Sequence, residues 1–375
     1  MLIGIDASRA AAAERTGTEN YSLYLIRALL QVGSAHRFRL YFSQAPPEGL
    51  FLRNERVSWR VLPLPRLWTH LRLAGEVALH PPDVLYVPAH VLPWLHPRRC
   101  VATVHDLGYL YYPQAHTRWA RWYLDRTTRF NARAARRVIA DSQATRDDLV
   151  AHYGVDPAKI VVAYPAGAPG LGPVTDVALL EAVQRRYSTS ARYFLYVGTL
   201  QPRKNLETLV QAFAELVIQD IIPAEVKLVL AGRRGWLYGE LFALVQRLGL
   251  ERRVVFPGYV AAEDLAALLS GALAYVLPSW YEGFGLPVLE AMACETPVIC
   301  SNVSSLPEVA GDAALLVDPH DVSGLVQALA RVFREPALRA ELIARGRERV
   351  RVFSWQRCAE QVLAVLEAVG REDGH

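Results

Sequence analysis

Short apolar runs alternate with longer amphipathic segments along the chain. The first run, at residues 2–5, leads through a Gly/Thr loop into a segment at 21–32 whose leucines recur at helical spacing. Further apolar runs at 84–90, 99–107 and 136–142 each end at proline or polar residues. Strands that alternate with helices are typical of a parallel α/β sheet, because parallel strands must be joined by crossovers. The pattern therefore predicts an α/β domain.

The alternation begins again in the second half of the chain. A strand is predicted at 193–200, and an amphipathic helix at 205–216 with Asn205 as its N-cap. Apolar runs reading VKLVLAG, RRVVFPGYV, LAYVLPS and PVICSN continue the strands, and helices are predicted at 261–270 and 287–294. This second series predicts another α/β domain of the same kind.

A Pro- and Gly-rich segment at 165–175 separates the two series and is the predicted linker. We therefore expect two Rossmann-like domains, at 1–170 and 171–352, that face each other across a ligand-binding cleft. The amphipathic tail, within 353–375, is predicted to form a last helix that crosses back to the first domain. A chain of 375 residues suits this division, since single cores stop growing near ~250–300 residues.

Composition and charge narrow the class of protein. Apolar residues make up 52% of the chain, an ordinary globular value, and the formal net charge of +4 is too small to indicate a nucleic-acid-binding protein. The four cysteines lack CxxC spacing, so neither a disulfide framework nor a zinc site is predicted. No signal peptide and no apolar run of ~18 residues is recognised, which favours a cytoplasmic protein, at most peripheral at the inner face of the membrane.

The segment SWYEGFGLPVLE combines a predicted anion-binding turn with two carboxylates. It follows a predicted buried strand, and Pro287 suits the first position of a helix, where its missing N–H costs nothing. Gly283 and Gly285 allow positive φ and a close approach of a ligand to backbone N–H groups. Glu282 lies beside these glycines. Glu290 is expected in the first helical turn, where an acid stabilises the helix dipole even without a ligand.

The longer stretch from Pro278 to Pro319, which contains this turn, resembles the signature region of the retaining GT-B glycosyltransferases of glycosyltransferase family four, with their Glu-x7-Glu motif. The resemblance continues through YVGTLQPRKNLETLVQAF and VVFPGYV in the second half and through TVHDLGYLYYP and RRVIADSQATRDDL in the first. It covers nearly the whole chain, and VGTLQPRKN is most similar to the mannosyltransferase subset. The fold class that the resemblance implies is the α/β GT-B fold.

The resemblance assigns roles to the two glutamates. The first glutamate of the motif contacts hydroxyls of the donor sugar, so Glu282 is predicted to be catalytic, and a carboxylate can accept from two vicinal hydroxyls. The second glutamate holds the nucleotide ribose, which gives Glu290 a donor-binding role. The turn between them is expected to face the diphosphate through Gly283, Phe284, Gly285 and Leu286.

Three further groups complete the donor site that the resemblance implies. Arg203 and Lys204 precede a helix start and are expected to meet the charge of the diphosphate, whereas Thr199 stands where many relatives carry an arginine. Gly17, in the Gly/Thr loop, is expected to let the backbone approach the donor phosphates or the acceptor. The base pocket is expected to be lined by the backbone of Gly258, Tyr259 and Val260.

His105 lies at the end of a predicted strand, at the ligand edge of a doubly wound sheet. In the family this histidine approaches the donor sugar and the reaction centre, so it is predicted to be catalytic; without that role it would be a hydrogen-bonded residue at the sheet edge. Asp106 is expected to brace the following loop. Ser142 is expected to cap a helix that begins near Ala144.

These residues predict a retaining hexosyltransferase of polysaccharide biosynthesis, with GDP-mannose as the favoured donor and a glycan or lipid-linked sugar as the acceptor. No cofactor is predicted, and the lack of Asp-x-Asp after a strand predicts catalysis without a metal. UDP-glucose or another nucleotide hexose stays open as the donor. A nucleotide-sugar epimerase and a silent nucleotide-sugar-binding protein of the same fold also stay open. The lack of GxGxxG, GxSxG and Walker sequences argues against dehydrogenases, serine hydrolases and P-loop proteins.

The segment at 116–137 interleaves arginines with aromatic residues at helical spacing. Trp119, Trp122, Tyr123 and Phe130 are predicted to share one face of a helix, with arginines on another. A basic amphipathic helix of this kind either lies on an anionic membrane or packs on the first domain's sheet with a solvated basic face. The first alternative predicts peripheral contact with a membrane.

Overall fold

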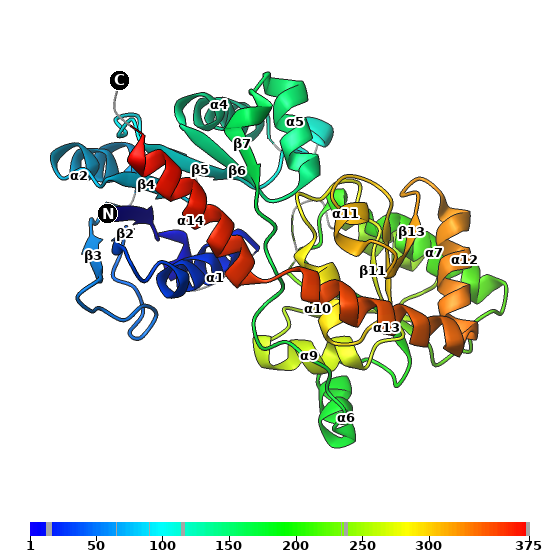
Figure 1. The fold of residues 1–375 in the computed structure, drawn as a ribbon. Coiled ribbons are helices and arrows are strands. Elements are labelled where there is room, and N and C mark those ends of the chain that lie inside the picture. Colours follow the sequence, from blue (N-terminus) through cyan, green and yellow to red (C-terminus); the bar gives the residue numbers. More distant parts are fainter. Residues whose placement is uncertain are drawn as a thin grey trace. The chain divides into compact units, whose positions relative to one another are not determined.

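The computed structural model describes residues 1–12, 17–64, 66–89, 91–113, 117–233, 235 and 239–372 (Figure 1). His90, His116 and residues 14–16 of the Gly/Thr loop belong to predicted segments but lie outside the described residues. The chain divides into two compact units, one formed by Met1–Ala168 with Phe353–His375 and the other by Pro169–Val352. The chain therefore passes between the units twice.

The first unit is built on seven parallel strands in the order β3-β2-β1-β4-β5-β6-β7. The chain runs outward from β1 to β3 and then from β4 to β7 on the other side, so the topological switch point lies between β1 and β4. Inner strands such as β5 are buried along their whole length, which explains their continuous apolar sequences. The strands are β1 (Leu2–Asp6), β2 (Arg37–Phe42), β3 (Val57–Val61), β4 (Val84–Val87), β5 (Cys100–Val104), β6 (Arg137–Ala140) and β7 (Ile160–Val162).

The last helix of the chain packs on α1 in the first unit (Figure 1). Its N-cap Ser354 accepts a hydrogen bond from the Arg357 backbone N–H, and its buried face carries Cys358, Val362 and Leu366. The predicted return of the C-terminal helix to the first domain is confirmed. The helices of this unit are α1 (Gly17–Val32), α2 (Ala74–Leu79), α3 (Gly108–Tyr111), α4 (Arg118–Ala134), α5 (Gln143–Tyr153) and α14 (Trp355–Arg371), with shorter turns at Arg9–Ala11, Thr69–Leu73 and Pro157–Lys159.

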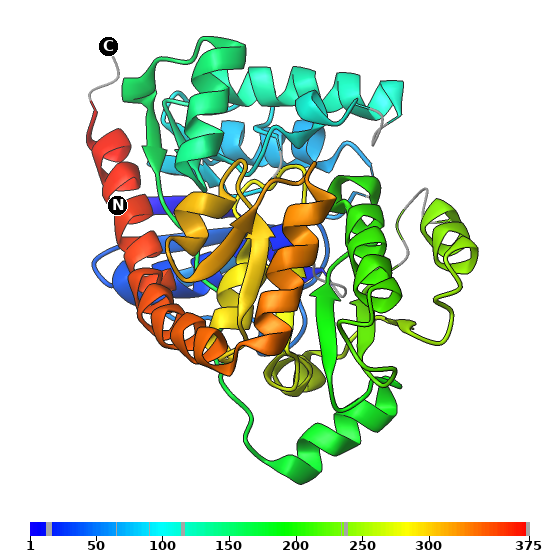
Figure 2. The same ribbon diagram turned by 90° about the vertical axis from the view of Figure 1, so that its right-hand side faces the viewer.

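The second unit repeats this plan with six parallel strands in the order β10-β9-β8-β11-β12-β13, which puts its switch point between β8 and β11. Helices α7 and α12 lie side by side against this sheet (Figure 2). The strands are β8 (Tyr193–Val197), β9 (Lys227–Ala231), β10 (Val254–Gly258), β11 (Ala274–Leu277), β12 (Val298–Ser301) and β13 (Ala314–Val317). The helices are α6 (Val177–Arg186), the turn η5 (Pro202–Lys204), α7 (Leu206–Ile218), α8 (Gly239–Arg247), α9 (Ala262–Ser270), α10 (Leu286–Ala293), α11 (Leu306–Ala310), α12 (Val322–Arg334) and α13 (Pro336–Val352).

Asn205 precedes α7 but does not cap it through its side chain. Its backbone is left-handed, with φ 55°, and its side-chain amide donates to the carbonyl oxygens of Pro278 (3.0 Å) and Pro319 (2.9 Å). The Thr208 hydroxyl donates to Asn205 Oδ1 at 2.7 Å. Asn205 is thus the N-cap residue of α7, as predicted, but its side chain ties the end of η5 to two other loops and makes no capping hydrogen bond.

The basic aromatic segment forms α4, as its spacing predicted. Trp119, Trp122 and Tyr123 are 78%, 53% and 52% exposed, and their i, i+3, i+4 spacing places them on one side of the helix. Phe130, three turns further along the same side, is partly buried and packs against the apolar core of the first unit, so the aromatic face is exposed only in its first half. Within the described residues, no helix is long and apolar enough to cross a membrane.

Candidate active site

The two loops that leave the switch point of the second unit hold its main polar cluster. The loop after β8 carries Arg203 and Lys204, and the loop after β11 carries Glu282. Since β8 and β11 are hydrogen-bonded neighbours, these loops meet at one edge of the sheet. Their backbones are also joined directly, because Trp280 N–H donates to the Arg203 carbonyl oxygen at 3.0 Å.

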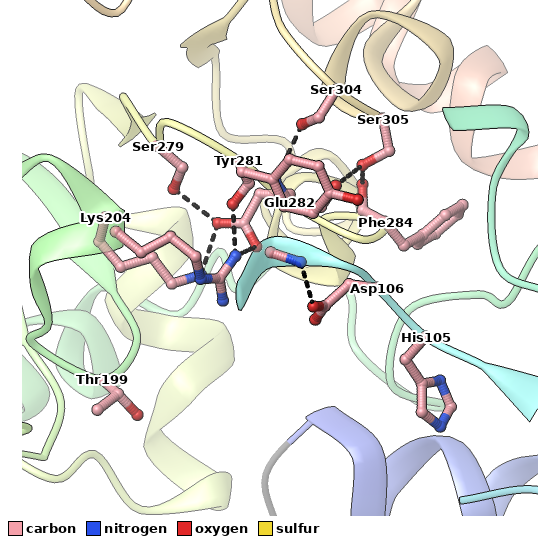
Figure 3. Close-up of polar contacts among 12 residues, drawn as sticks. His105, Asp106, Thr199, Lys204, Ser279, Tyr281, Glu282, Phe284, Ser304 and Ser305 are labelled. Carbon is pink, nitrogen blue, oxygen red and sulfur yellow. Dashed lines mark hydrogen bonds and ion pairs between the residues drawn. The ribbon is translucent and has the colours of Figure 1, made fainter. Parts of the chain in front are cut away.

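Glu282 is buried and both of its carboxylate oxygens are engaged (Figure 3). Oε1 accepts from Lys204 Nζ and from the Ser279 hydroxyl, each at 2.6 Å. Oε2 accepts from an Arg203 guanidinium nitrogen at 3.1 Å, and this guanidinium also donates to the Tyr281 carbonyl oxygen. The structure thus brings together three of the predicted site residues as one ion cluster.

The glycine-rich turn is held in shape by two serines (Figure 3). Glu282 N–H donates to the Ser304 hydroxyl at 2.9 Å. The Ser305 hydroxyl lies 2.9 Å from the Glu282 carbonyl oxygen and 2.8 Å from that of Phe284. Gly285 has φ +105°, and a Cβ there would lie 2.7 Å from a Leu306 methyl carbon. Glycine is therefore required at this position by both backbone conformation and space.

Helix α10 begins one residue earlier than its proline suggested. Leu286 is its first residue and Pro287 its second, and the helix has no acidic residue in its first turn. Glu290 is its fifth residue and half-buried, so its predicted place in the first turn is wrong. The helix-dipole explanation for this carboxylate loses its support, because that effect falls off within the first turn.

The charges of this cluster follow from its burial and its pairing. Burial alone would raise the pKa of Glu282, but the Lys204 ammonium and the Arg203 guanidinium outweigh it and lower the pKa to about 2. The carboxylate is therefore ionised at neutral pH. One carboxylate between two cations leaves a net positive charge at the edge of the sheet, beside the anion-binding turn.

Strands β8, β9 and β10 end at glycines that approach one another closely. A Cβ on Gly232 would lie 1.8 Å from the Gly198 carbonyl oxygen, and Gly232 N–H donates to the Gly258 carbonyl oxygen at 2.7 Å. Beyond this point Tyr259 is 60% exposed, with the Arg233 guanidinium 4.9 Å from the centre of its ring. The three glycines, Tyr259 and Arg233 therefore lie together at the carboxyl ends of β8, β9 and β10.

In the first unit, β5 delivers His105 to the carboxyl edge of the sheet, as its sequence predicted. His105 Nδ1 lies 2.6 Å from an Asp141 carboxylate oxygen, and Asp141 follows β6, the next strand. The Tyr21 ring meets the imidazole edge-on with 4.7 Å between ring centres. Asp106 accepts from Gly108 N–H at 2.8 Å and so braces the loop (Figure 3), as expected.

Burial disfavours a charged imidazole, but the Asp141 and Asp106 carboxylates and the Pro88 carbonyl oxygen together outweigh burial, and the pKa of His105 is raised. Burial also raises the pKa of Asp141, although pairing with His105 opposes that rise. The buried pair as a unit therefore retains a proton to a higher pH than a free histidine would.

Two other expectations concern helix starts in the first unit. Ser142 caps α5, accepting from Thr145 N–H at 3.0 Å, so its predicted capping role is confirmed. Gly17 is the first residue of α1, and a Cβ there would meet nothing within 4 Å. Within the first unit, neighbouring atoms therefore give no steric reason for a glycine at this position. Across the described ranges, no three His, Cys, Asp or Glu side chains gather as a metal site would require.

Sequence reasoning missed Ser279, Ser305, Asp141 and Tyr21. Ser279 and Ser305 lie inside the stretch from Pro278 to Pro319 that carries the resemblance, and that position was the only sequence signal for them, since their burial is known from the structure. Asp141 stands 36 residues after His105, and only the pairing of β5 with β6 joins them.

Comparison with known proteins identifies the family. A family model described as "Glycosyltransferase Family 4" matches residues 15–166, and one described as "Glycosyl transferases group 1" matches residues 182–349. The chain is 31% identical to O-antigen chain mannosyltransferase B of Escherichia coli, over 93% of this chain and 95% of that protein. The chain belongs to glycosyltransferase family 4.

Solved structures support the same fold for this family 4 glycosyltransferase. Sucrose-phosphate synthase from Thermosynechococcus elongatus has a TM-score of 0.76 and 25% identity, with 98% of each chain covered. Anabaena HepE, solved with UDP and glucose, has a TM-score of 0.72 and 19% identity, over 98% of this chain and 99% of that one. The predicted GT-B fold class, with two Rossmann-like domains, is confirmed.

The ion cluster makes a prediction about stability. Glu282→Gln is expected to lower the free energy of unfolding at pH 7 by roughly 2–4 kcal/mol, because it leaves two cations without their buried carboxylate. The pKa of Glu282 is depressed to about 2, so its contribution is complete above the unfolded value of ~4.3 and is lost as pH falls toward 2. The difference from wild type should therefore narrow between pH 7 and pH 3, as measured by urea denaturation.

Glu251→Gln, at an exposed position in the same unit, is the matched control and should change the stability little at either pH. A difference between wild type and Glu282→Gln that is equally large at both pH values would contradict the prediction.

Proposed function

We propose that this glycosyltransferase transfers mannose from GDP-mannose to a hydroxyl of a glycan or lipid-linked acceptor, with retention of anomeric configuration and without a metal ion. The observation that carries the proposal is the cluster of Arg203, Lys204 and Glu282 at the switch point of the second unit. The relative named O-antigen chain mannosyltransferase B supports the choice of sugar. UDP-glucose is the second candidate donor, supported by the fold shared with HepE, which was solved with UDP-glucose.

In this proposal the turn after β11 receives the donor diphosphate. The backbone N–H groups of Phe284, Gly285 and Leu286 lie at the N-terminus of α10, where an anion is stabilised. Lys204 and Arg203 supply the positive charge beside it. The remaining donor contacts are assigned to Gly283 at the turn, Glu290 at the ribose, Gly17 near the phosphates, and Gly258, Tyr259 and Val260 at the base.

The donor must share its cations with Glu282. Lys204 and Arg203 side chains are only 12% and 18% exposed, and both already contact that carboxylate. Glu282 thus holds the two cations in place before the donor arrives, which reduces the reorganisation needed when negative charge develops on the phosphate. In the proposed complex, Glu282 keeps this contact while it accepts from hydroxyls of the sugar.

The proposed reaction needs no side chain as a general base. The bond between the sugar C1 and the diphosphate oxygen breaks, and a bond from C1 to the acceptor oxygen forms on the same face. The acceptor proton passes to the departing phosphate oxygen, so charge and atoms balance. Lys204 and Arg203 stabilise that phosphate, and His105 contacts the transferred sugar.

A ligand panel tests the choice of donor. GDP, UDP and dTDP are added separately in thermal unfolding, since a ligand that binds the folded state raises its stability by RT ln(1+[L]/Kd). We expect the largest shift with GDP. Lys204→Ala should weaken GDP binding by roughly 10- to 100-fold, because a charge-assisted contact to phosphate is lost. Lys227→Ala is the matched control. Lys227 is the first residue of β9, at the amino end of the strand and away from the carboxyl edge that holds the cluster, so this variant should bind GDP as wild type does.

Donor turnover without acceptor then separates the candidate reactions. Slow release of GDP with free mannose from GDP-mannose supports the transferase, whereas a free epimer of the nucleotide sugar supports an epimerase. Turnover of UDP-glucose alone would overturn the choice of mannose, and binding without any turnover would overturn the enzyme proposal.

Glu282 is expected to matter more for turnover than for binding. Glu282→Gln should lower kcat by about 100-fold or more, because the contact of the carboxylate with the sugar hydroxyls in the transition state is lost. Its dissociation constant for GDP should stay within a few-fold of wild type, since the anion-binding turn and both cations remain. Full activity in Glu282→Gln would contradict the assigned role.

We also propose that α4 attaches the enzyme to the inner face of a membrane. Exposed Trp119, Trp122 and Tyr123 lie on a helix that also carries several arginines, which is the composition of an interfacial helix. The Arg126 guanidinium lies 5.6 Å from the Trp122 ring centre, so cationic and aromatic groups share this surface. Anionic lipid offers partners to both.

Vesicle co-sedimentation checks this attachment. We expect the protein to pellet with vesicles of phosphatidylcholine and phosphatidylglycerol more than with phosphatidylcholine alone, and less at high salt. The double variant Trp119→Ser with Trp122→Ser should lose most of this binding. Trp94→Ser, at a tryptophan 66% exposed in the same unit, is the control. Binding that does not depend on anionic lipid would remove the proposal.

A further inference from the structure

A buried polar cluster surrounds the inner side of His105. Five elements of the first unit contribute to it, which is unusual because buried polar groups are costly unless they are paired. Thr103 Oγ1 and the Tyr86 hydroxyl are 2.7 Å apart, and Tyr21, Asp141 and Cys358 interact electrostatically with this group. The members are Tyr21 from α1, Tyr86 from β4, Thr103 from β5, Asp141 after β6 and Cys358 from α14.

Asp141 makes the direct contact with His105 in this cluster. Its carboxylate lies 2.6 Å from Nδ1, and because an ionised carboxylate only accepts hydrogen bonds, an ionised Asp141 requires the proton on Nδ1. The Asp141 side chain is 7% exposed and follows a central strand, so it cannot move away easily. The pair therefore determines which imidazole nitrogen remains for a ligand.

The rest of the imidazole is held just as firmly. The Thr145 hydroxyl donates to the His105 carbonyl oxygen at 3.2 Å and fixes the backbone, while the Tyr21 ring packs edge-on against the imidazole. Nε2 is buried and makes no hydrogen bond of acceptable geometry among the described residues, although the Pro88 carbonyl oxygen lies close enough to favour the charged imidazole. One imidazole nitrogen is thus committed to Asp141, and the other is not.

We propose that Asp141 is a positioning residue that fixes the orientation and the tautomer of His105 and keeps the imidazole charged, so that Nε2–H donates a hydrogen bond to an oxygen of the transferred sugar or its phosphate. This inference rests on the proposed function, which places the sugar at His105. Asp141 itself touches no substrate.

The charges around the pair agree with this role. Asp106 and Asp141 are the acids that favour a charged imidazole. Burial raises the pKa of the Tyr21, Tyr86 and Cys358 side chains, so all three remain neutral at physiological pH. The Tyr21 hydroxyl favours the ionised form of Asp141. None of these named neighbours is a cation that would oppose the imidazolium.

The direction of the pH effect follows. The raised pKa of His105 keeps the imidazolium present until the pH exceeds that value. Asp141→Asn removes a carboxylate that opposes the effect of burial, so the imidazolium is lost at a lower pH. The alkaline limb of kcat should therefore move to lower pH, whereas a residue that only stabilises the fold would leave the profile in place.

The experiment uses the full chain and two readouts. For Asp141→Asn we expect the alkaline limb of kcat for donor turnover to move down by on the order of one pH unit, and kcat at pH 8 to fall about tenfold, with KM for the donor changed less than about twofold. Asp141→Glu should restore part of the wild-type profile. Asp147→Asn, an exposed aspartate on α5, is the matched control and should follow wild type.

Nitrogen-15 NMR of the His105 imidazole provides the second readout. In wild type, Nδ1 should carry a proton throughout the titration, and Asp141→Asn should titrate at a lower pH. An unprotonated Nδ1 in wild type, or an unshifted kcat profile in a folded Asp141→Asn variant, would overturn the inference.

The two readouts also distinguish a failure of this inference from a failure of the proposed glycosyltransferase function. If no donor of the panel is turned over, the proposed function fails, while the NMR titration still tests the pair by itself. If Asp141→Asn does not fold, the wild-type titration and Asp141→Glu decide the question.

Discussion

The buried contact of Glu282 with Lys204 and Arg203 is the constraint on which the second unit's site depends. A carboxylate this far from water is stable only because two cations meet it, and removing one partner of such a group typically costs about 3–5 kcal/mol. The same contact joins the loop after β8 to the loop after β11. It therefore fixes the glycine-rich turn and the two cations relative to each other.

The first unit solves a related problem differently. There, the paired residues directly follow two adjacent strands, β5 and β6, and neutral hydroxyl and thiol groups surround them. The strands of a parallel sheet move little, so His105 is held by the most rigid part of its unit. Both units thus place these charged side chains just after the carboxyl ends of strands. This is the edge at which doubly wound α/β sheets bind ligands.

The features of the candidate site that could be predicted from the sequence are those that depend on residues close together in the chain. The strand–turn–helix pattern and its glycines identified the Glu282 turn, and the position of Lys204 before a helix suggested its charge would be used. Contacts between distant segments were not readable. Asn205 looked like a cap because its spacing fits one, but hydrogen bonds to Pro278 and Pro319 decide its conformation. Nothing in the sequence indicated that Asp141 contacts His105, because only the pairing of β5 with β6 brings them together.

The place of α14 has a consequence for biosynthesis. The ribosome makes this helix after the whole Pro169–Val352 unit, yet the helix packs on α1 and supplies Cys358 to the surroundings of Asp141. The Pro169–Val352 unit is a single continuous segment and is free to fold while the chain is still being made. The unit that holds His105 must wait for α14, so the surroundings of Asp141 are completed only after the intervening unit has been made.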